Sequence, residues 1–222
     1  MTKMDAAQRE AFVREKTQLL APPLIPEIRL HTASEITPIW EATEAALEEI
    51  GVAPPFWAFA WAGGQALARY LLDNPDTVAG KRVLDFASGS GLSAIAAKRA
   101  GALRVEANEI DALAGAAIGM NAQENGVELE LLMEDLIGTA NRGWDVVLAG
   151  DVCYEQPMAG RVEAWLRSLA GAGSLVLMGD PNRTYMPKGG LTRVAKYSVI
   201  TTREIEDTDV RNATVWRVEP DG

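Results

Sequence analysis

The sequence contains one cysteine and one histidine, Cys153 and His31, among its 222 residues. One cysteine excludes an internal disulfide, and the two residues together cannot supply the four ligands of a structural zinc site. A metal held by carboxylates alone stays open, but no spacing of acids favours one. We therefore predict no metal, and we expect His31 to be structural or exposed.

Long apolar runs are also missing. The first residues, MTKMDAAQREAFVREKTQLLAPP, mix acids and bases without an apolar centre, which fits neither a signal peptide nor a transit peptide. No window approaches the about 18 uninterrupted apolar residues of a membrane-spanning helix. We expect no membrane association and a cytoplasmic location.

Positive charge is scarce. Lys and Arg total 21 against 31 Asp and Glu, which gives a net charge of −10. Such a surface repels the phosphate backbone, and no cluster of basic residues with interleaved aromatics offsets this. Nucleic acid is not expected as a partner, whereas a basic or lysine-bearing protein fits the charge better.

From residue 81 onward, predicted strands alternate with predicted helices. The strands cover 81–87, 103–109, 127–135, 144–151 and 174–181, and the helices cover 91–101, 111–126 and 158–173. This alternation predicts right-handed βαβ units and a parallel sheet covered on both faces. Two closing strands, 196–205 and 214–220, predict an antiparallel hairpin at one edge. The predicted fold is α/β, with a seven-stranded Rossmann-like sheet that is mostly parallel.

The N-terminal quarter has a different pattern. Helices are predicted over 1–21 and 41–52, with a proline-punctuated extended stretch over 22–40 between them. A further helix is predicted over 63–74. We divide the chain into a helical and extended N-terminal extension, residues 1–55, and one cofactor-binding domain, residues 56–222.

The stretch VLDFASGSG, residues 83–91, predicts a nucleotide-binding turn. Gly89, Gly91 and Ala94 satisfy the G-x-G-x-x-[GA] pattern, and Glu109 lies 20 residues after Gly89, as in a dinucleotide fingerprint. Asp85 opposes that interpretation, because two like charges about 4 Å apart cost about 4 kcal/mol at a surface-like dielectric. A dinucleotide-dependent oxidoreductase stays an alternative that Asp85 disfavours.

A cationic nucleoside fits these acids better. S-adenosylmethionine carries an ammonium and a sulfonium and has no phosphate. Asp85 would hold the ammonium directly or through water, and Glu109 would accept both ribose hydroxyls. Asp135 would meet the adenine amino group, and Leu136 would lie on the ring. Small residues let the backbone approach the ligand: Ala87, Ser88 and Gly89.

The motifs DFASGSG, ANEID, EDL and GDVCY resemble the successive motifs of class I, seven-strand S-adenosylmethionine methyltransferases. GDVCY resembles the Asp/Glu-x-x-Tyr motif of the protein lysine methyltransferases of family 16. The segments FWAFAWAGGQALARYLLDNP, GDPNR and NATVWRVEP resemble those members that act on the β-subunit of electron transfer flavoprotein. The resemblance runs from about residue 55 to the C-terminus and implies that subunit as the acceptor, with S-adenosylhomocysteine as the second product.

The resemblance also implies a pocket. Trp61 would cover the cofactor. Ala87 stands where the family has its first loop glycine, and its methyl group is expected to need a negative φ. The implied pocket positions are Ala87, Ser88, Gly89, Ser90, Asn108, Glu109, Ile110, Leu136 and Gly150.

Asp151 and Tyr154 follow the fourth strand, at the sheet edge where ligands bind. Methyl transfer to an amine is an in-line displacement from a good leaving group, so the enzyme must mainly place a neutral amine and exclude water. Asp151 would orient the amine, and Tyr154 would supply a phenol oxygen and an aromatic wall. The alternatives are a helix cap for Asp151 and edge packing for Tyr154. Cys153 is expected to serve in packing.

Substrate contacts are expected from two further places. Trp57, Phe56 and Trp40 are aromatic candidates, and the loop after the fifth strand of the alternating region carries polar ones: Asp180, Asn182 and Arg183. The sequence therefore predicts a monomeric protein-lysine N-methyltransferase. A methyltransferase for another acceptor, such as a ribosomal protein, and a non-catalytic domain of the same fold stay alternatives.

Overall fold

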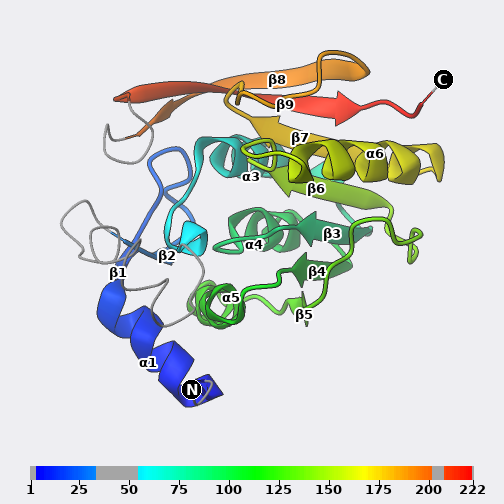
Figure 1. Ribbon diagram of the computed structural model, residues 1–222. Coiled ribbons are helices and arrows are strands. Elements are labelled where there is room, and N and C mark those ends of the chain that lie inside the picture. The colour runs from blue at the N-terminus through cyan, green and yellow to red at the C-terminus, as the bar shows by residue number, and fades with distance from the viewer. Residues whose placement is uncertain (1–3, 34–54, 202–207, 222) are drawn as a thin grey trace.

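The computed structural model describes residues 4–33, 55–201 and 208–221. These residues form a seven-stranded sheet in the order β5-β4-β3-β6-β7-β9-β8 (Figure 1). Neighbours from β5 to β7 pair in parallel, and β9 and β8 pair antiparallel. The predicted α/β fold, with its antiparallel hairpin at one edge, is confirmed. The strands are β3 (Arg82–Phe86), β4 (Arg104–Asn108), β5 (Glu130–Leu132), β6 (Val146–Gly150), β7 (Leu175–Asp180), β8 (Leu191–Ile200) and β9 (Val210–Val218).

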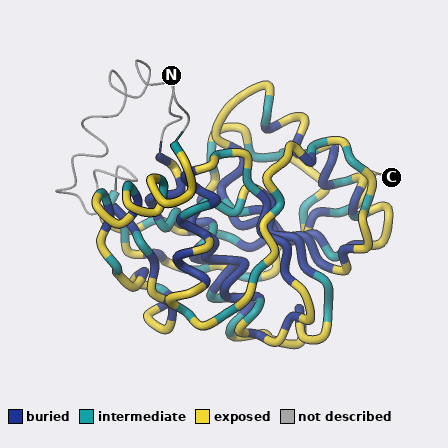
Figure 2. Tube along the Cα trace, turned by 90° about the horizontal axis from the view of Figure 1, so that it is seen from below, coloured by how far each residue is buried: buried dark blue, intermediate teal, exposed yellow. Residues whose placement is uncertain are grey.

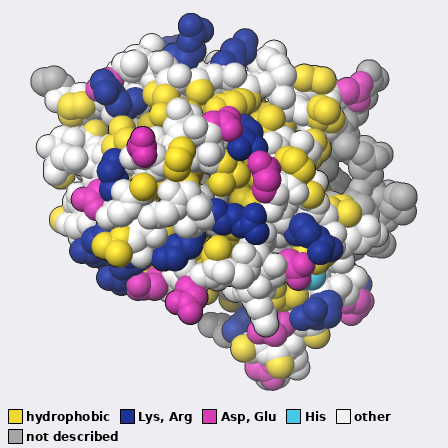
Figure 3. Space-filling view, turned by 180° about the vertical axis from the view of Figure 1, so that it is seen from behind, with side chains coloured by type: hydrophobic (Ala, Val, Ile, Leu, Met, Phe, Trp, Pro, Cys, Tyr) yellow, Lys and Arg dark blue, Asp and Glu magenta, His cyan; other side chains and the backbone are white. Residues whose placement is uncertain are grey.

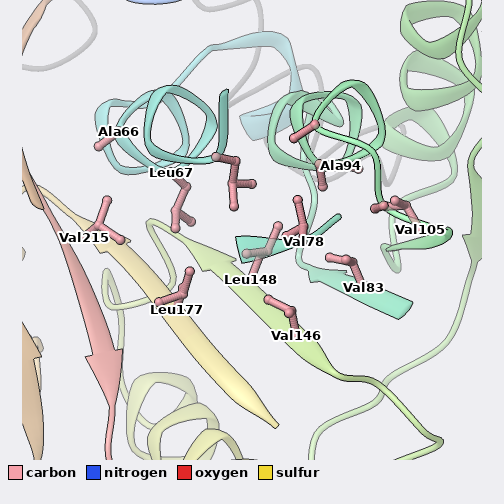
Figure 4. Close-up of a cluster of buried hydrophobic side chains, with 14 of the residues drawn as sticks. Ala66, Leu67, Val78, Val83, Ala94, Val105, Val146, Leu148, Leu177 and Val215 are labelled. Atoms are coloured by element: carbon pink, nitrogen blue, oxygen red, sulfur yellow. The ribbon is translucent and has the colours of Figure 1, made fainter. Parts of the chain in front are cut away.

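Helices cover both faces of the sheet. On one face α3 (Ala62–Asp73), α4 (Leu92–Arg99) and α5 (Ala112–Glu124) contribute to a core that includes Leu67, Leu148 and Leu177 (Figure 4). On the other face α6 (Met158–Gly171) packs over Val147 and Met178. The central strands are therefore buried on both sides, as the dark segments in Figure 2 show. This explains their continuous apolar runs, because a doubly covered parallel strand has no solvent face.

The closing hairpin is shifted from its predicted position. β8 begins at Leu191 rather than at residue 196, and β9 begins at Val210 rather than at residue 214. Pairing extends from Leu191 opposite Val218 to Ile200 opposite Val210, with a bulge between Arg193 and Ala195. Sequence inspection missed these extensions because β8 is an edge strand and residues 210–213 of β9 pair with β8 alone, so both expose polar residues that look like a connection.

β5 is shorter than predicted, with three residues in place of nine. It pairs with β4 alone, from Glu130 opposite Glu106 to Leu132 opposite Asn108. β4 ends at Asn108, so no partner continues the ladder past Leu132. The chain after Leu132 therefore leaves the ladder and crosses the carboxyl edge of the sheet.

The helix predicted over 1–21 ends earlier. α1 (Ala6–Lys16) begins at a capping box in which Asp5 and Gln8 exchange hydrogen bonds. After it, β1 (Gln18–Leu20) pairs antiparallel with β2 (Leu30–Thr32). Residues 18–20 are therefore held as a strand by their pairing with β2, and the helix ends before them. The predicted helix over 41–52 and Trp40 lie outside the described residues.

The described part of the N-terminal extension packs on the sheet's helices. Ile25, Ile28 and Leu30 are fully buried in one cluster with residues of α3 and α4. The backbone N–H of His31 donates to Asn121 of α5 at 2.7 Å. The His31 ring lies 3.2 Å from the Thr17 hydroxyl, which agrees with the structural role expected for it.

Two further observations concern the surface. The face in Figure 3 carries acidic, basic and apolar side chains interspersed with one another. Over the residues that the structure describes, every helix is too short or too polar to span a bilayer.

Candidate active site

A cavity of about 370 Å³ opens at the carboxyl ends of β3, β4 and β6, where ligands bind open α/β sheets. The start of α3 and the loop after β7 close its other sides. Most of the predicted site residues line it: Trp57, Trp61, Ala87, Gly89, Asn108, Glu109, Ile110, Asp135, Gly150, Asp151, Tyr154 and Arg183.

Asp85 lies behind the loop and does not line the cavity. Its side chain, 2% exposed, accepts hydrogen bonds from the Ser88 hydroxyl and from the backbone N–H of Ala94 at 3.0 Å. Burial raises the pKa of Asp85 to about 7, although these hydrogen bonds oppose the shift, and the charge of Glu109 adds to it. Asp85 thus fixes the loop to the first turn of α4, whereas Glu109 faces the cavity, and the role of Asp85 toward the cofactor ammonium stays a prediction.

Ala87 adopts a φ of +50°, so the expected negative φ was wrong. The left-handed conformation costs an alanine about 1–2 kcal/mol. It persists because the turn is held on both sides: Ser88 N–H donates to the Asn108 carbonyl at 2.9 Å, and Gly89 N–H donates to Glu109 Oε1 at 2.9 Å. These contacts bind the β3 loop to the end of β4.

Both carboxylate oxygens of Glu109 are held by backbone N–H groups at the rim of the cavity. Oε1 accepts from Gly89 N–H, and Oε2 accepts from Ile110 N–H at 3.0 Å. Burial raises the pKa of Glu109, and the hydrogen bonds from Gly89, Ile110 and Asp111 oppose the shift. Its neighbour Asn108 donates to the carbonyls of Leu132, at the end of β5, and of Glu134 after it, and so joins the two strand ends.

Five more predicted residues do not line the cavity. Leu136 is fully buried in the core on the α6 face, and Ser90, in the loop after β3, is 5% exposed. Asp180 is buried at the end of β7, where its Oδ1 accepts from the backbone N–H of Arg183 at 2.7 Å. Ser88 and Asn182 lie in the loops after β3 and β7, and the ligand roles given to all five stay predictions.

Asp151 is held on both carboxylate oxygens. Oδ2 accepts from Gly64 N–H at 2.8 Å, and Oδ1 accepts from Arg183 Nε at 3.1 Å and Nη2 at 2.6 Å. The alternative role as a helix cap is wrong, because α6 begins after Pro157 without a side-chain cap. Asp151 itself has a φ of +57°, a strained conformation of the kind found at functional sites.

An aromatic group forms one wall. The rings of Phe56 and Tyr154 lie 5.4 Å apart, and Phe56 also lies 6.3 Å from Trp61. The Trp61 indole N–H donates to the Phe56 carbonyl at 2.8 Å, which fixes its orientation. Tyr154 is 42% exposed, and burial of its phenol raises its pKa, so it is neutral at physiological pH.

The buried side chains of Trp57 and Cys153 differ in their hydrogen bonding. Within the described residues the indole N–H of Trp57, a 2% exposed side chain, has no hydrogen-bond partner. Trp57 also contributes to the lining of the cavity, but its indole nitrogen is itself buried. Cys153 is buried against Met178, and burial raises its pKa to about 12, which agrees with the packing role expected for it.

The charges of the cavity suit a cation without phosphate. Its acids are Glu109, Asp111, Glu134, Asp135 and Asp151, and Arg183 is the base among its described residues. Since the Arg183 guanidinium is already paired with Asp151, the charges left to a ligand in the cavity are carboxylates. These groups fit S-adenosylmethionine and oppose a diphosphate.

Sequence inspection missed several lining residues. Phe86, Asp111, Ala114, Glu134, Ile137, Val152 and Met158 line the cavity as well. Most stand within three residues of a predicted position, so strand ends were a sufficient signal for them. Met158 begins α6 and gave no such signal.

Solved structures of methyltransferases share this fold. Magnesium protoporphyrin IX methyltransferase of Synechocystis PCC 6803 with bound SAM matches with a TM-score of 0.52 and 19% identity, over 70% of this chain and 77% of that chain. A putative RNA methyltransferase of Pyrococcus horikoshii matches with a TM-score of 0.54 and 15% identity, over 71% and 83%. The family model of ribosomal protein L11 methyltransferase (PrmA) matches residues 65–153. Fold and site define an S-adenosylmethionine-dependent methyltransferase.

Similarity over almost the whole chain narrows this class. The electron transfer flavoprotein β-subunit lysine methyltransferase of Homo sapiens is 37% identical over 221 residues, 95% of this chain and 82% of the relative. The Xenopus laevis protein of that name is 38% identical, over 95% and 87%. The chain belongs to this family of protein-lysine N-methyltransferases. The alternative of a dinucleotide-dependent oxidoreductase is thereby set aside.

Proposed function

We propose that the protein transfers methyl groups from S-adenosylmethionine to lysine side chains of the β-subunit of electron transfer flavoprotein. The extent of the similarity carries this proposal. Relatives named for that substrate match 95% of the chain, whereas the L11 methyltransferase of Geobacter sulfurreducens, 42% identical, matches 44% of it. The family model of the L11 enzymes ends at residue 153, before the loop that carries Arg183.

The cavity residues divide into two groups under this proposal. When bound, S-adenosylmethionine supplies a methyl group on a sulfonium. Glu109, at the end of β4, would bind the ribose hydroxyls, and Trp61 would cover the ligand. Asp135 would meet the adenine amino group, since its side chain is 60% exposed at the cavity rim.

The acceptor side is formed by Asp151 and the aromatic wall. Asp151 would orient the lysine amine, and its own geometry is fixed by Gly64 and Arg183. Tyr154 stands 5.4 Å from Phe56 and would form a wall for the methylated ammonium. Exclusion of water at this wall favours the neutral amine that attacks.

Parallel incubations with two candidate substrates test the acceptor. Enzyme and labelled S-adenosylmethionine are incubated with purified electron transfer flavoprotein, and in parallel with ribosomal protein L11. We expect label in the β-subunit, on lysines that mass spectrometry identifies, and background label in L11. Label confined to L11 would replace the proposed acceptor with the ribosomal one, for which the match of the PrmA family model speaks.

The domain boundary at residue 55, the monomeric state and the cytoplasmic location are also proposed, from the sequence. Light scattering of the purified protein checks the second, and fractionation of cells checks the third. A truncated chain beginning at residue 56 checks the first, since it should bind the cofactor if the domain is autonomous.

A further inference from the structure

The guanidinium of Arg183 joins the two sides of the site. Two of its nitrogens donate to the same oxygen of Asp151, and its Cζ lies 5.4 Å from the centre of the Trp61 ring. The two side chains of the ion pair are 18% and 8% exposed. The pair is therefore shielded from solvent ions, and its charges act at close to full strength on whatever enters the cavity.

The loop after β7 builds this position. The Arg183 backbone N–H is held by Asp180, and Asn182 turns the chain with a φ of +69°. Asparagine tolerates this left-handed conformation better than most residues. Arg183 is thus placed by its backbone and by a cation–π contact with Trp61, which suits a fixed electrostatic role.

Under the proposed function, Asp151 has conflicting effects on the acceptor. A carboxylate beside an amine orients it by accepting a hydrogen bond. The same negative charge also favours the ammonium form and raises the pKa of the lysine, which is about 10.4 in water. An ammonium has no lone pair and cannot attack. A carboxylate that is already paired with a guanidinium avoids this effect.

We propose that Arg183 is a positioning residue that keeps the acceptor lysine uncharged, because its guanidinium neutralises Asp151 and repels a second cation. The carboxylate then orients an amine and does not trap an ammonium. This inference rests on the proposed function. It adds the element that lets a carboxylate-lined site use a neutral nucleophile.

Other ionisable groups near this pair come from the surrounding strand ends. Tyr154 and Cys153 follow β6, and the raised pKa of each keeps it neutral through the physiological range. In the first turn of α3, the described residues contribute no ionisable side chain. The remaining acids are Glu109 and Asp111 after β4, Glu134 and Asp135 after β5, Glu155 after β6, Glu163 on α6 and Asp180 at the end of β7.

The pH dependence of kcat tests the inference, because kcat reports ionisations in the enzyme–substrate complex. The neutral variants Arg183→Met and Arg183→Gln should move the midpoint of the kcat profile upward by about one pH unit. That shift lowers kcat about tenfold at pH 7.5, and the loss should shrink as the pH rises. KM for the protein substrate should not rise, since Asp151 then binds the ammonium form.

Three controls accompany these variants. Arg183→Lys keeps the positive charge and should keep the wild-type midpoint. Arg217→Gln removes an equal charge from an exposed ion pair with Glu219 on β9 and should leave the profile unchanged. Thermal melting and calorimetry with S-adenosylhomocysteine show which variants are folded, and methionine retains an apolar contact with Trp61.

Several results would overturn the inference. One is a wild-type midpoint in either folded neutral variant, and another is an equal loss of kcat at every pH, which indicates a structural role. If neither neutral variant folds, a shifted midpoint in Arg183→Lys would also overturn the inference. Failure of the proposed function is distinguishable, because the wild-type enzyme would then place no methyl group on the flavoprotein subunit at any pH.

Discussion

The backbone N–H of Gly64 donates a 2.8 Å hydrogen bond to Oδ2 of Asp151, which ties the first turn of α3 to the end of β6. The neighbouring Gly63 is just as close to the sheet. A methyl group on its Cα would lie 2.2 Å from the Gly179 carbonyl oxygen and 2.6 Å from Asp151 Oδ2. The absence of side chains at this turn therefore determines where the carboxylate stands.

A matched pair of glycine variants checks this relationship. Gly63→Ala should lower the free energy of unfolding by about 1–3 kcal/mol, as overpacking does, and should displace Asp151. Gly64→Ala has no atom within 4 Å of its new methyl group and should stabilise the helix by about 0.5–1 kcal/mol. Chemical denaturation measures both. Equal stability of the two variants would contradict the close approach.

Asp151→Asn should abolish turnover while the cofactor still binds. Asparagine keeps the shape and can accept from Gly64, but it loses the ion pair with Arg183 and the carboxylate that orients the amine. We expect kcat to fall at least about 100-fold, which is typical for loss of a positioned polar group. Calorimetry with S-adenosylhomocysteine should show affinity within about twofold of wild type. Full turnover in this variant would remove Asp151 from the proposed mechanism.

Glu109→Ala should chiefly weaken cofactor binding. Loss of charge-assisted hydrogen bonds costs about 1.5–3 kcal/mol, so Kd for S-adenosylhomocysteine should rise about 10–100-fold. Glu109 also holds Gly89 N–H, so part of the loss comes from a looser loop. Asp5 lies outside the cavity and caps α1 by accepting from the backbone N–H of Gln8. Asp5→Asn can keep this cap and is therefore the control, with wild-type affinity expected.

Protonation of Asp85 should compete with cofactor binding. Its pKa of about 7 in the unliganded protein would fall when the ammonium of the ligand approaches, directly or through water. Affinity for S-adenosylhomocysteine should therefore drop about tenfold at pH 6 relative to pH 8, with proton release on binding near pH 7. Calorimetry in buffers of different ionisation enthalpy measures the released proton. Asp85→Asn should release none, and an equal release in that variant would assign the proton elsewhere.

The same group predicts a pH-dependent stability. The folded-state pKa of Asp85 is raised, so between about pH 4 and 7 the folded protein binds a proton that the unfolded chain has released. Stability from this group is therefore present at low pH and is lost as the pH rises to about 7. The free energy of unfolding of Asp85→Asn, relative to wild type, should increase by up to about 4 kcal/mol as the pH rises across this range. Urea denaturation at several pH values measures the difference, and a flat difference would contradict the shift.

Much of the fold could be predicted because its determinants are local. Continuous apolar strands, glycine-bounded helices and their alternation identify a doubly covered parallel sheet without knowledge of any contact. Strand ends also located the acids, since parallel strands place their carboxyl ends on one edge. By itself, the sequence determined that Glu109, Asp135 and Asp151 meet at that edge.

Only the tertiary structure decided what each acid does there. Asp85 and Glu109 stand at equivalent strand ends, yet one is buried behind the loop and the other faces the cavity. The pairing of Asp151 with Arg183 joins residues 32 positions apart, and the register of β6 and β7 sets it. Side-chain direction, burial and ion pairing depend on how closely α3 and the loops pack on the sheet, and no local pattern contains that distance.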